Sequence, residues 1–228
     1  IGDLASARAG FRDHFYGLAP FVREAAGDGG PDDLPPGWAG LVTAGLVDPG
    51  RCWWGERACR FAGRTWERPA VDLGALATAG GRVARWVAEL AVPKVVVAPQ
   101  TRVGEAAVDV GGSWVASVPT VALLAEPPDL WRVAAVVNAP PMAAHALAAS
   151  AGTALADGAI KLSGAQVLAL PLPADREAWA EAARALEIAD LDSFGPTMTA
   201  AYGLSADDPV VAWWQERRPR IGSRQGGS

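Results

Sequence analysis

The segment PKVVVAPQTRVGEAAVDVGGSWVASVPTVALL, residues 93–124, contains the strongest strand signals of the chain. Its first part, KVVVAPQTR (94–102), is a β-branched run of the kind that forms a buried strand. The segments AAVDV and WVASV flank the turn residues Gly111-Gly112, so we expect them to pair as a hairpin. The last part, PTVALLA, predicts a further strand. The segment therefore supplies four of the strands that the sequence predicts, including the clearest one.

Apolar residues at helical spacing surround this segment and predict the helices of the fold. The ranges with this spacing are 71–93, 129–138, 175–188 and 207–219. We expect Gly80-Gly81 to interrupt the first helix, and Pro140-Pro141 to end the second and to start another. Strands followed by helices predict the mixed α+β class, with one curled, mostly antiparallel sheet packed against helices and a helical extension at the C-terminal end.

Composition and charge narrow the function classes. The chain has 228 residues, half of them hydrophobic and 20% charged, which is typical of a globular protein. Its net charge is −5, so it is not a strongly basic, free-standing nucleic-acid binder. Among its 20 basic residues only Lys94 and Lys161 are lysines, and codon preference explains such a bias toward arginine. Because the sequence contains neither a long apolar run nor a signal peptide, we expect a cytoplasmic protein with no membrane contact and with reduced cysteines.

The stretch RCWWGERACRFAGRTWERP, residues 51–69, concentrates arginines, aromatic residues and both cysteines. Its hydrophobic pattern predicts short strands with Gly55 and Gly63 in the turns. Between residues 51 and 68, five arginines stand against two glutamates, which gives a local charge of +3 (5 − 2). Arginines interleaved with aromatic residues suit phosphate contacts and base stacking. The alternative is that they form the solvated face of a β-ribbon.

Metal and nucleophilic chemistry have little support in the sequence. A structural zinc site needs four ligands, whereas Cys52 and Cys59 have no further cysteine or histidine close by in sequence, so we expect two buried thiols. His14 and His145 have no evident nucleophile and carboxylate to act with, and no nucleophile-elbow, Walker or dinucleotide-binding glycine motif occurs. Residues 138–142, NAPPM, differ from the Asn-Pro-Pro-aromatic motif of amino-group DNA methyltransferases, and we interpret them as a corner between two helices.

The first 26 residues predict a folded N-terminal region. Between Gly10 and Gly17, the residues Phe11, Phe15 and Tyr16 are expected to form an aromatic core. The following residues, GDGGPDDLPPG, have the composition of a loop.

The end of the strand at 94–102 carries the residues Gln100, Thr101 and Arg102. Glutamine and arginine make bidentate contacts to adenine and guanine in the major groove of DNA. At a strand end they would project from a rigid support into a loop region. The alternative is an ordinary polar strand terminus.

Four segments, taken in order, resemble a known family. IGDLASARAGFRDHFYG (1–17) has the form of a strand and turn followed by a polar-aromatic loop, and LVTAGLVDPG (41–50) follows as a short apolar element. Residues 93–124 have the form of a central hairpin with a polar, basic tip. In 129–173, a helix ending at an asparagine precedes a second helix, the strand residues Lys-Leu-Ser and a closing Leu-Pro-Leu-Pro. This order resembles the target recognition domain of N6-adenine DNA methyltransferases, the C-terminal specificity domain of TaqI-like, type IIG and type I restriction-modification enzymes.

The resemblance implies a DNA target recognition domain over residues 1–173 and a helical extension over 174–228 with a disordered tail. It implies that the chain reads double-stranded DNA while an N-terminal methyltransferase domain or subunit, outside this chain, binds S-adenosylmethionine and methylates a flipped adenine. The chain itself is then no enzyme and holds no cofactor or metal. We expect a bacterial restriction-modification or phage-defence system, and weak, salt-sensitive DNA binding by the chain alone.

Nine residues are the expected DNA contacts. The resemblance assigns the major-groove bases to Gln100, Thr101 and Arg102. It assigns phosphate contacts to Arg51, Arg57, Arg60, Arg64, Lys161 and Ser163.

Two other function classes stay open from the sequence. Ten tryptophans could provide exposed platforms for a carbohydrate- or protein-binding module. That alternative requires tryptophans such as Trp53, Trp54, Trp66 and Trp114 to line an exposed groove. An independent enzyme would require a pocket with a histidine beside a carboxylate.

Overall fold

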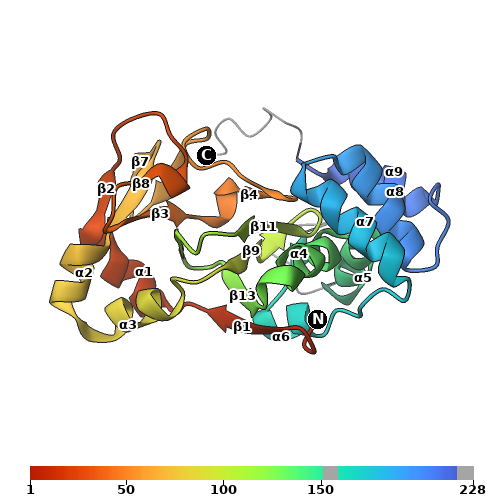
Figure 1. Cartoon of the computed structure of the whole chain (residues 1–228), viewed down its shortest axis with the longest axis horizontal. Helices are drawn as coiled ribbons and strands as arrows, with labels where there is room; N and C mark the ends of the chain where they lie inside the picture. The colour runs from red at the N-terminus through yellow and green to blue at the C-terminus, as the bar shows by residue number, and fades with distance from the viewer. Residues whose placement is uncertain (151–158, 220–228) are drawn as a thin grey trace.

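The computed structural model describes residues 1–150 and 159–219 and contains helices and mostly antiparallel sheets, which confirms the α+β class (Figure 1). Most strands belong to two four-stranded sheets, in place of the single curled sheet that the sequence predicted. The first sheet has the order β1 (Ala5–Ala9), β13 (Val121–Ala125), β9 (Lys94–Ala98) and β11 (Glu105–Asp109). The second has the order β12 (Trp114–Ala116), β3 (Trp38–Val42), β8 (Pro69–Asp72) and β2 (Val22–Glu24).

Shorter elements complete the strand and turn structure. Three two-stranded ribbons pair β4 (Val47–Asp48) with β5 (Arg51–Cys52), β6 (Cys59–Phe61) with β7 (Arg64–Trp66), and β10 (Gln100–Thr101) with β14 (Ile160–Lys161). The 3-10 turns within the described residues are η1 (Ala19–Phe21), η2 (Pro31–Asp33), η3 (Ala44–Leu46) and η4 (Pro127–Asp129). Gly63 has a positive φ of 77° in the turn between β6 and β7, as the sequence predicted for a turn residue.

Strand β9 divides the interior into two hydrophobic cores. Val95 and Val97 belong to one core, whereas Val96 and Ala98 belong to the other. This division follows from strand geometry, because successive side chains point to opposite faces of a sheet. A strand buried on both faces needs an uninterrupted apolar run, and this explains the sequence VVVA.

The first core is covered by six helices. These helices are α4 (Leu130–Asn138), α5 (Pro140–Ser150), α6 (Gly164–Leu168), α7 (Arg176–Glu187), α8 (Leu191–Ala201) and α9 (Pro209–Arg217). In Figure 1, α7, α8 and α9 lie at one end of the molecule, and α6 lies beside β1. Trp179, Phe194 and Trp214, from the region expected to be an extension, are buried in the same core as Val95. The helices after residue 173 are therefore integral to this core, and the expected disordered tail, 220–228, lies outside the described residues.

The second core lies between the two sheets and the helices α1 (Arg12–Leu18), α2 (Leu73–Ala79) and α3 (Gly81–Glu89). Gly80 and Gly81 have φ values of 65° and 86°, and the helix breaks between α2 and α3 as predicted. Figure 1 shows α2 and α3 at the opposite end of the molecule from α7, α8 and α9, with β9, β11 and β13 between them.

The hairpin predicted around Gly111-Gly112 is wrong. Strand β11 pairs with β9, and β12 leaves this sheet to run parallel to β3, with Trp114 opposite Gly40. The Asp109 carboxylate accepts hydrogen bonds from the backbone N–H groups of Ser113 and Trp114, both at 3.0 Å. These hydrogen bonds hold a turn that directs the chain away from β11, so β12 joins the other sheet.

The interpretation of residues 138–142 as a helix corner is confirmed, because α4 ends at Asn138 and α5 begins at Pro140. Asn138 is fully buried, and its amide bonds to the backbone of Ala106 in β11. Its Nδ2 donates to the Ala106 carbonyl at 3.0 Å and to the Ala134 carbonyl at 2.9 Å, while its Oδ1 accepts from the Ala106 N–H at 2.9 Å. The side chain therefore acts as a strand partner for β11 and fixes α4 to the sheet.

Candidate nucleic-acid interface

The ribbon formed by β10 and β14 brings together residues that lie far apart in sequence. Gln100 is paired with Lys161 and Thr101 with Ile160, and the Leu162 N–H donates to the Pro99 carbonyl at 2.9 Å. Directly opposed residues of an antiparallel pair project to the same face, with their Cβ atoms about 5 Å apart. Gln100 and Lys161 are both exposed, so the ribbon presents an amide and an ammonium group side by side.

The residues next to this ribbon have different surroundings. Arg102 is exposed, and its carbonyl accepts a 3.5 Å hydrogen bond from Nε of Arg217 in α9. Ser163 caps α6, because its hydroxyl accepts from the Gln166 N–H at 3.3 Å while Gln166 Oε1 accepts from the Ser163 N–H at 2.8 Å. Thr101 is buried, and its hydroxyl donates to the Val103 carbonyl. This placement argues against Thr101 as a groove-reading residue.

Arg57 lies in a structural cluster around Asp48. Its guanidinium donates to both oxygens of the Asp48 carboxylate at 3.2 and 2.8 Å, and to the Gly45 carbonyl at 3.0 Å. Trp53 Nε1 donates to the same carboxylate at 2.6 Å. Only 11% of the Arg57 side chain and 8% of the Asp48 side chain are exposed. These contacts occupy Arg57 inside the fold and leave it poorly placed for a phosphate.

The contrast between Arg57 and Arg60 gives a stability prediction. Arg57→Gln should lower the free energy of unfolding by about 1–3 kcal/mol, because it leaves the buried Asp48 carboxylate without its cation. Arg60 is exposed, and Arg60→Gln should change this free energy by less than about 0.5 kcal/mol. Urea unfolding followed by circular dichroism measures both values. Equal effects of the two substitutions would contradict the structural role of Arg57.

Four of the five arginines in residues 51–69 lie over tryptophan rings. These pairs, with guanidinium-to-ring distances, are Arg51 on Trp53 at 3.8 Å, Arg57 on Trp53 at 4.9 Å, Arg64 on Trp66 at 4.5 Å and Arg68 on Trp54 at 4.7 Å. Arg51 also pairs with Glu56 at 2.7 Å. The alternation of arginine and tryptophan therefore has a structural cause, since each guanidinium covers one side of a buried ring.

Arg60 and Arg64 point to opposite faces of the β6–β7 ribbon. The register pairs Arg60 with Thr65 and Phe61 with Arg64, so Arg64 shares its face with the buried Phe61. Both arginine side chains are exposed. They stay available to a phosphate, although one flat surface cannot contact both from the same face of the ribbon.

The cysteines and His14 have surroundings that fit a structural role, whereas His145 is exposed. Both cysteines are free thiols; Cys59 is buried as predicted, whereas Cys52 is half-buried, and desolvation raises the pKa of Cys52 to about 12 and also raises the pKa of Cys59. Both thiols are therefore protonated near neutral pH. Nδ1 of the buried His14 accepts from the Phe11 N–H at 3.1 Å, and its ring stacks on Trp86 at 4.6 Å. Among residues 1–150 and 159–219, no group of three or more His, Cys, Asp or Glu side chains could hold a metal ion.

The tryptophans do not form the exposed platform that a carbohydrate- or protein-binding module would need. All ten lie in the described part of the chain, and each is buried or half-buried. Trp53, Trp54, Trp66 and Trp114 are all less than 10% exposed. The alternative function based on exposed tryptophans thus loses the feature that suggested it.

The exposed aromatic residues are instead Phe11, the N-cap of α1, and Tyr16 within α1, which corrects the predicted aromatic core. Phe15 packs into the second core, but Phe11 is 71% exposed and Tyr16 is 57% exposed. Consecutive helical residues are rotated by about 100°, so Phe15 and Tyr16 cannot share one buried face. Helical spacing applied to this short segment would have indicated the exposure of Tyr16.

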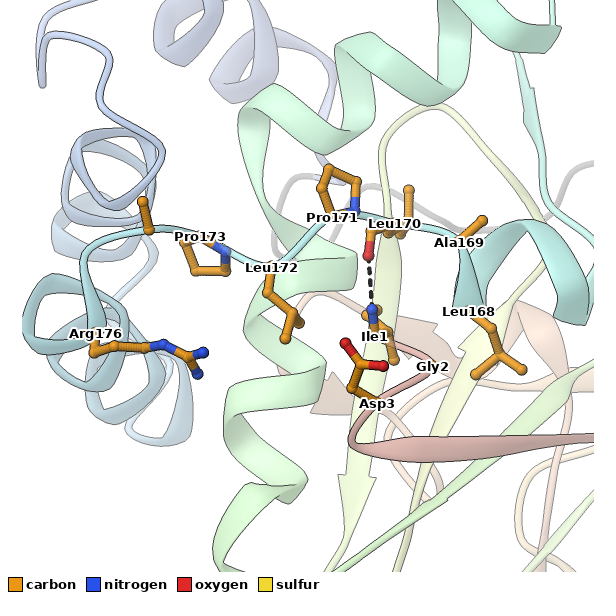
Figure 2. Close-up of a pocket in the computed structure, with 11 residues that line it drawn as sticks. Ile1, Gly2, Asp3, Leu168, Ala169, Leu170, Pro171, Leu172, Pro173 and Arg176 are labelled. Carbon is orange, nitrogen blue, oxygen red and sulfur yellow. Dashed lines mark hydrogen bonds between the residues drawn. The ribbon is translucent and has the colours of Figure 1, made fainter.

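Figure 2 shows a depression between the first residues of the chain and the segment that leads into α7. Its volume is about 540 Å³, and its charged lining side chains are Asp3 and Arg176. The Ile1 ammonium group donates to the Leu170 carbonyl at 2.7 Å, and burial lowers the pKa of that group. The remaining lining comes from aliphatic, proline and glycine residues, a composition that offers no nucleophile with a general base.

Comparison of the sequence with models of known protein families and with curated proteins gave no match. In the described residues, no helix combines the length and the apolar character needed to cross a lipid bilayer. A function for this chain therefore has to be inferred from its sequence and from the geometry of the site.

Proposed function

We propose that this chain is the DNA target recognition domain of an N6-adenine DNA methyltransferase. The supporting observation is the β10–β14 ribbon, where Gln100 and Lys161 lie opposite each other although 60 residues separate them in the chain. The resemblance of the sequence assigned both residues to DNA, and the fold brings them to one exposed place. A two-stranded ribbon is one of the two backbone elements that fit the major groove of B-DNA.

The residues of this proposal divide between base edges and phosphates. Gln100 and Arg102 read base edges, because an amide and a guanidinium form the bidentate pairs that distinguish adenine and guanine. Lys161 contacts a phosphate next to them as a point charge. One of Arg60 and Arg64, which are exposed on opposite faces of the β6–β7 ribbon, supplies a further phosphate contact. Thr101 and Arg57 have no part in the interface, since internal hydrogen bonds hold both.

Methyl transfer belongs to a separate catalytic domain or subunit in this proposal. S-adenosylmethionine binds to that catalytic part, and no residue of this chain is assigned to the cofactor or to the chemistry. The complete enzyme acts in the bacterial cytoplasm as part of a restriction-modification or phage-defence system. The net charge of −5 is consistent with a chain that binds DNA weakly alone and gains affinity from its catalytic partner.

Substitutions at Gln100 and Lys161 test this division of roles. With a duplex that the chain enriches from a random pool, Gln100→Ala should reduce discrimination at one or two base pairs by about 1–3 kcal/mol. Lys161→Met should weaken binding to all duplexes alike and lower the slope of log K against log salt by about 1. Fluorescence anisotropy over a salt series measures both effects.

The matched controls are Gln215→Ala and Arg184→Gln, which change exposed residues of α9 and α7. Both should leave affinity, discrimination and salt dependence unchanged. The proposed function is wrong if Gln100→Ala and Lys161→Met behave like these controls.

A further inference from the structure

The loop that joins β9 to β11, residues 99–104, carries the two proposed base readers. Exposure alternates along this loop, because Gln100 and Arg102 are exposed while Thr101 between them is 9% exposed. Side chains two residues apart in an extended chain project to the same side. Gln100 and Arg102 therefore point outward from the loop, and Thr101 points into the protein.

Backbone hydrogen bonds fix the first half of this loop. The Leu162 N–H donates to the Pro99 carbonyl at 2.9 Å, and β10 is paired with β14 as far as Thr101. Strand pairing thus holds the backbone of Gln100 in place. The pairing does not reach Arg102, so the backbone of that residue needs other contacts to hold it.

Two side chains hold successive carbonyl groups where the chain bends after β10. The Thr101 hydroxyl donates to the Val103 carbonyl. Nε of Arg217, at the end of α9, donates to the preceding carbonyl, that of Arg102, at 3.5 Å. Because Val103 is 0% exposed and belongs to the first core, water cannot replace the hydroxyl at its carbonyl. The loop ends at Gly104, where α4 leaves no room for a side chain.

A fixed backbone matters for an arginine that reads a base. Bidentate contact with guanine requires two N–H donors of the guanidinium to lie in line with the base edge. The arginine side chain itself has several rotatable bonds, so a backbone that also moved would add to the entropy lost on binding. A fixed backbone at Arg102 therefore affects discrimination between bases more than it affects the charge-based affinity for any duplex.

We propose that Thr101 is a positioning residue for Arg102, and that Arg217 of α9 shares this role. Neither Thr101 nor Arg217 contacts a base, and both act through the backbone of the loop. The inference rests on the proposed function, in which Arg102 reads a base edge. Helix α9 lies outside residues 1–173, the part that resembles a target recognition domain, and it thereby takes part in sequence specificity.

The test measures base preference on a duplex that the chain enriches from a random pool, and on its single-base-pair variants, by fluorescence anisotropy. Arg102→Ala first locates the base pair that Arg102 reads. Thr101→Val keeps a β-branched side chain and removes the hydroxyl, and it should lose about fivefold to 100-fold of the preference at that base pair. The preference at the base pair read by Gln100 should stay, because strand pairing holds that residue.

Further variants separate positioning from a general loss of structure. Thr101→Ser keeps the hydroxyl and should keep the wild-type preference. Arg217→Met should lose the preference at the same base pair as Thr101→Val. Its matched control is Arg218→Met, because Arg218 is the next residue but pairs with Asp192 at 2.7 Å, and this variant should keep the preference. Thr101→Val combined with Arg102→Ala should discriminate at that base pair no worse than Arg102→Ala alone.

Each remaining outcome counts against the inference. A wild-type preference in Thr101→Val, an equal loss at every base pair, or a loss in Thr101→Ser as large as that in Thr101→Val overturns it. A further loss in the double variant also overturns it, since the effect then does not pass through Arg102. A wild-type preference in Arg217→Met overturns the role of α9.

Two outcomes separate this inference from the proposed function. If Arg102→Ala keeps every preference while Gln100→Ala loses one, the positioning role is overturned and the proposed function stands. If the wild type shows no sequence preference, the proposed function itself is overturned. Should Thr101→Val lack a thermal unfolding transition, Arg217→Met decides the outcome, because its side chain lies outside the loop.

Discussion

Replacement of Gly104 by alanine is expected to destabilise the protein by at least about 3 kcal/mol. A Cβ at this position would lie 1.8 Å from the Val137 carbonyl oxygen and 2.9 Å from the carbonyl carbon, both of them backbone atoms. Relief of this overlap requires α4 to move away from the start of β11. That movement would also separate the Asn138 amide from the Ala106 backbone and expose the first core.

The measurement for this prediction is urea unfolding followed by far-ultraviolet circular dichroism. Gly74→Ala serves as the matched control, because Gly74 is exposed at the start of α2 and a Cβ there would make only an ordinary contact with Asp72. The control should be neutral or more stable by up to about 1 kcal/mol. A Gly104→Ala variant as stable as the wild type would show that α4 and β11 are not packed as described.

The second large effect is expected at the ion pair between Lys94 and Asp109, which bridges the start of β9 and the end of β11. Both side chains are 0% exposed, and burial lowers the pKa of Lys94. Asp109→Asn should lower the free energy of unfolding by about 3–5 kcal/mol, because it leaves the Lys94 ammonium buried without a counter-charge. The same unfolding experiment measures this loss.

A double substitution identifies the cause of that loss. In Lys94→Met with Asp109→Asn, no buried charge remains, and the single asparagine oxygen can still accept one of the two N–H groups, of Ser113 and Trp114, that bond to different oxygens of Asp109. The double variant should therefore be more stable than Asp109→Asn alone by at least about 1 kcal/mol. Strictly additive losses would mean that the two charges are not coupled.

The local features of the fold could be predicted because local chemistry determines them. Gly80-Gly81 interrupts a helical pattern, and the structure has two helices with these residues between them. The helix predicted over 175–188 is α7, and its N-cap Asp175 accepts from the N–H groups of Glu177 and Ala178 at 3.0 Å. In both places a few neighbouring residues fix the backbone, so the sequence is sufficient.

The pairing of β12 could not be predicted in the same way. The alternation of apolar and polar residues over 114–118 fits a hairpin with β11 as well as it fits a strand in another sheet. Such alternation defines the two faces of a strand and does not identify the neighbouring strand. The decision depends on Asp109, whose carboxylate holds the corner while its charge meets Lys94. That contact exists only once β9 and β11 are paired.

The arrangement of the candidate interface was likewise not predictable from local sequence. The sequence indicated Gln100 and Lys161 separately, but their pairing joins segments 60 residues apart and has no local signature. Their close spacing in sequence suggests that the arginines of residues 51–69 act together, whereas in the structure they differ in how deeply they are buried. Arg57 is held by Asp48, and Arg60 and Arg64 remain exposed on opposite faces of a ribbon.

The central claim is that this chain reads a DNA sequence through the β10–β14 ribbon. Selection of duplexes from a random pool by the chain, at a salt concentration of about 50 mM, tests it most directly. Sequencing of the recovered pool should show one short enriched sequence, and Gln100→Ala should remove the preference at one or two of its positions. A recovered pool without sequence preference, or the same preference in Gln100→Ala, would contradict the account.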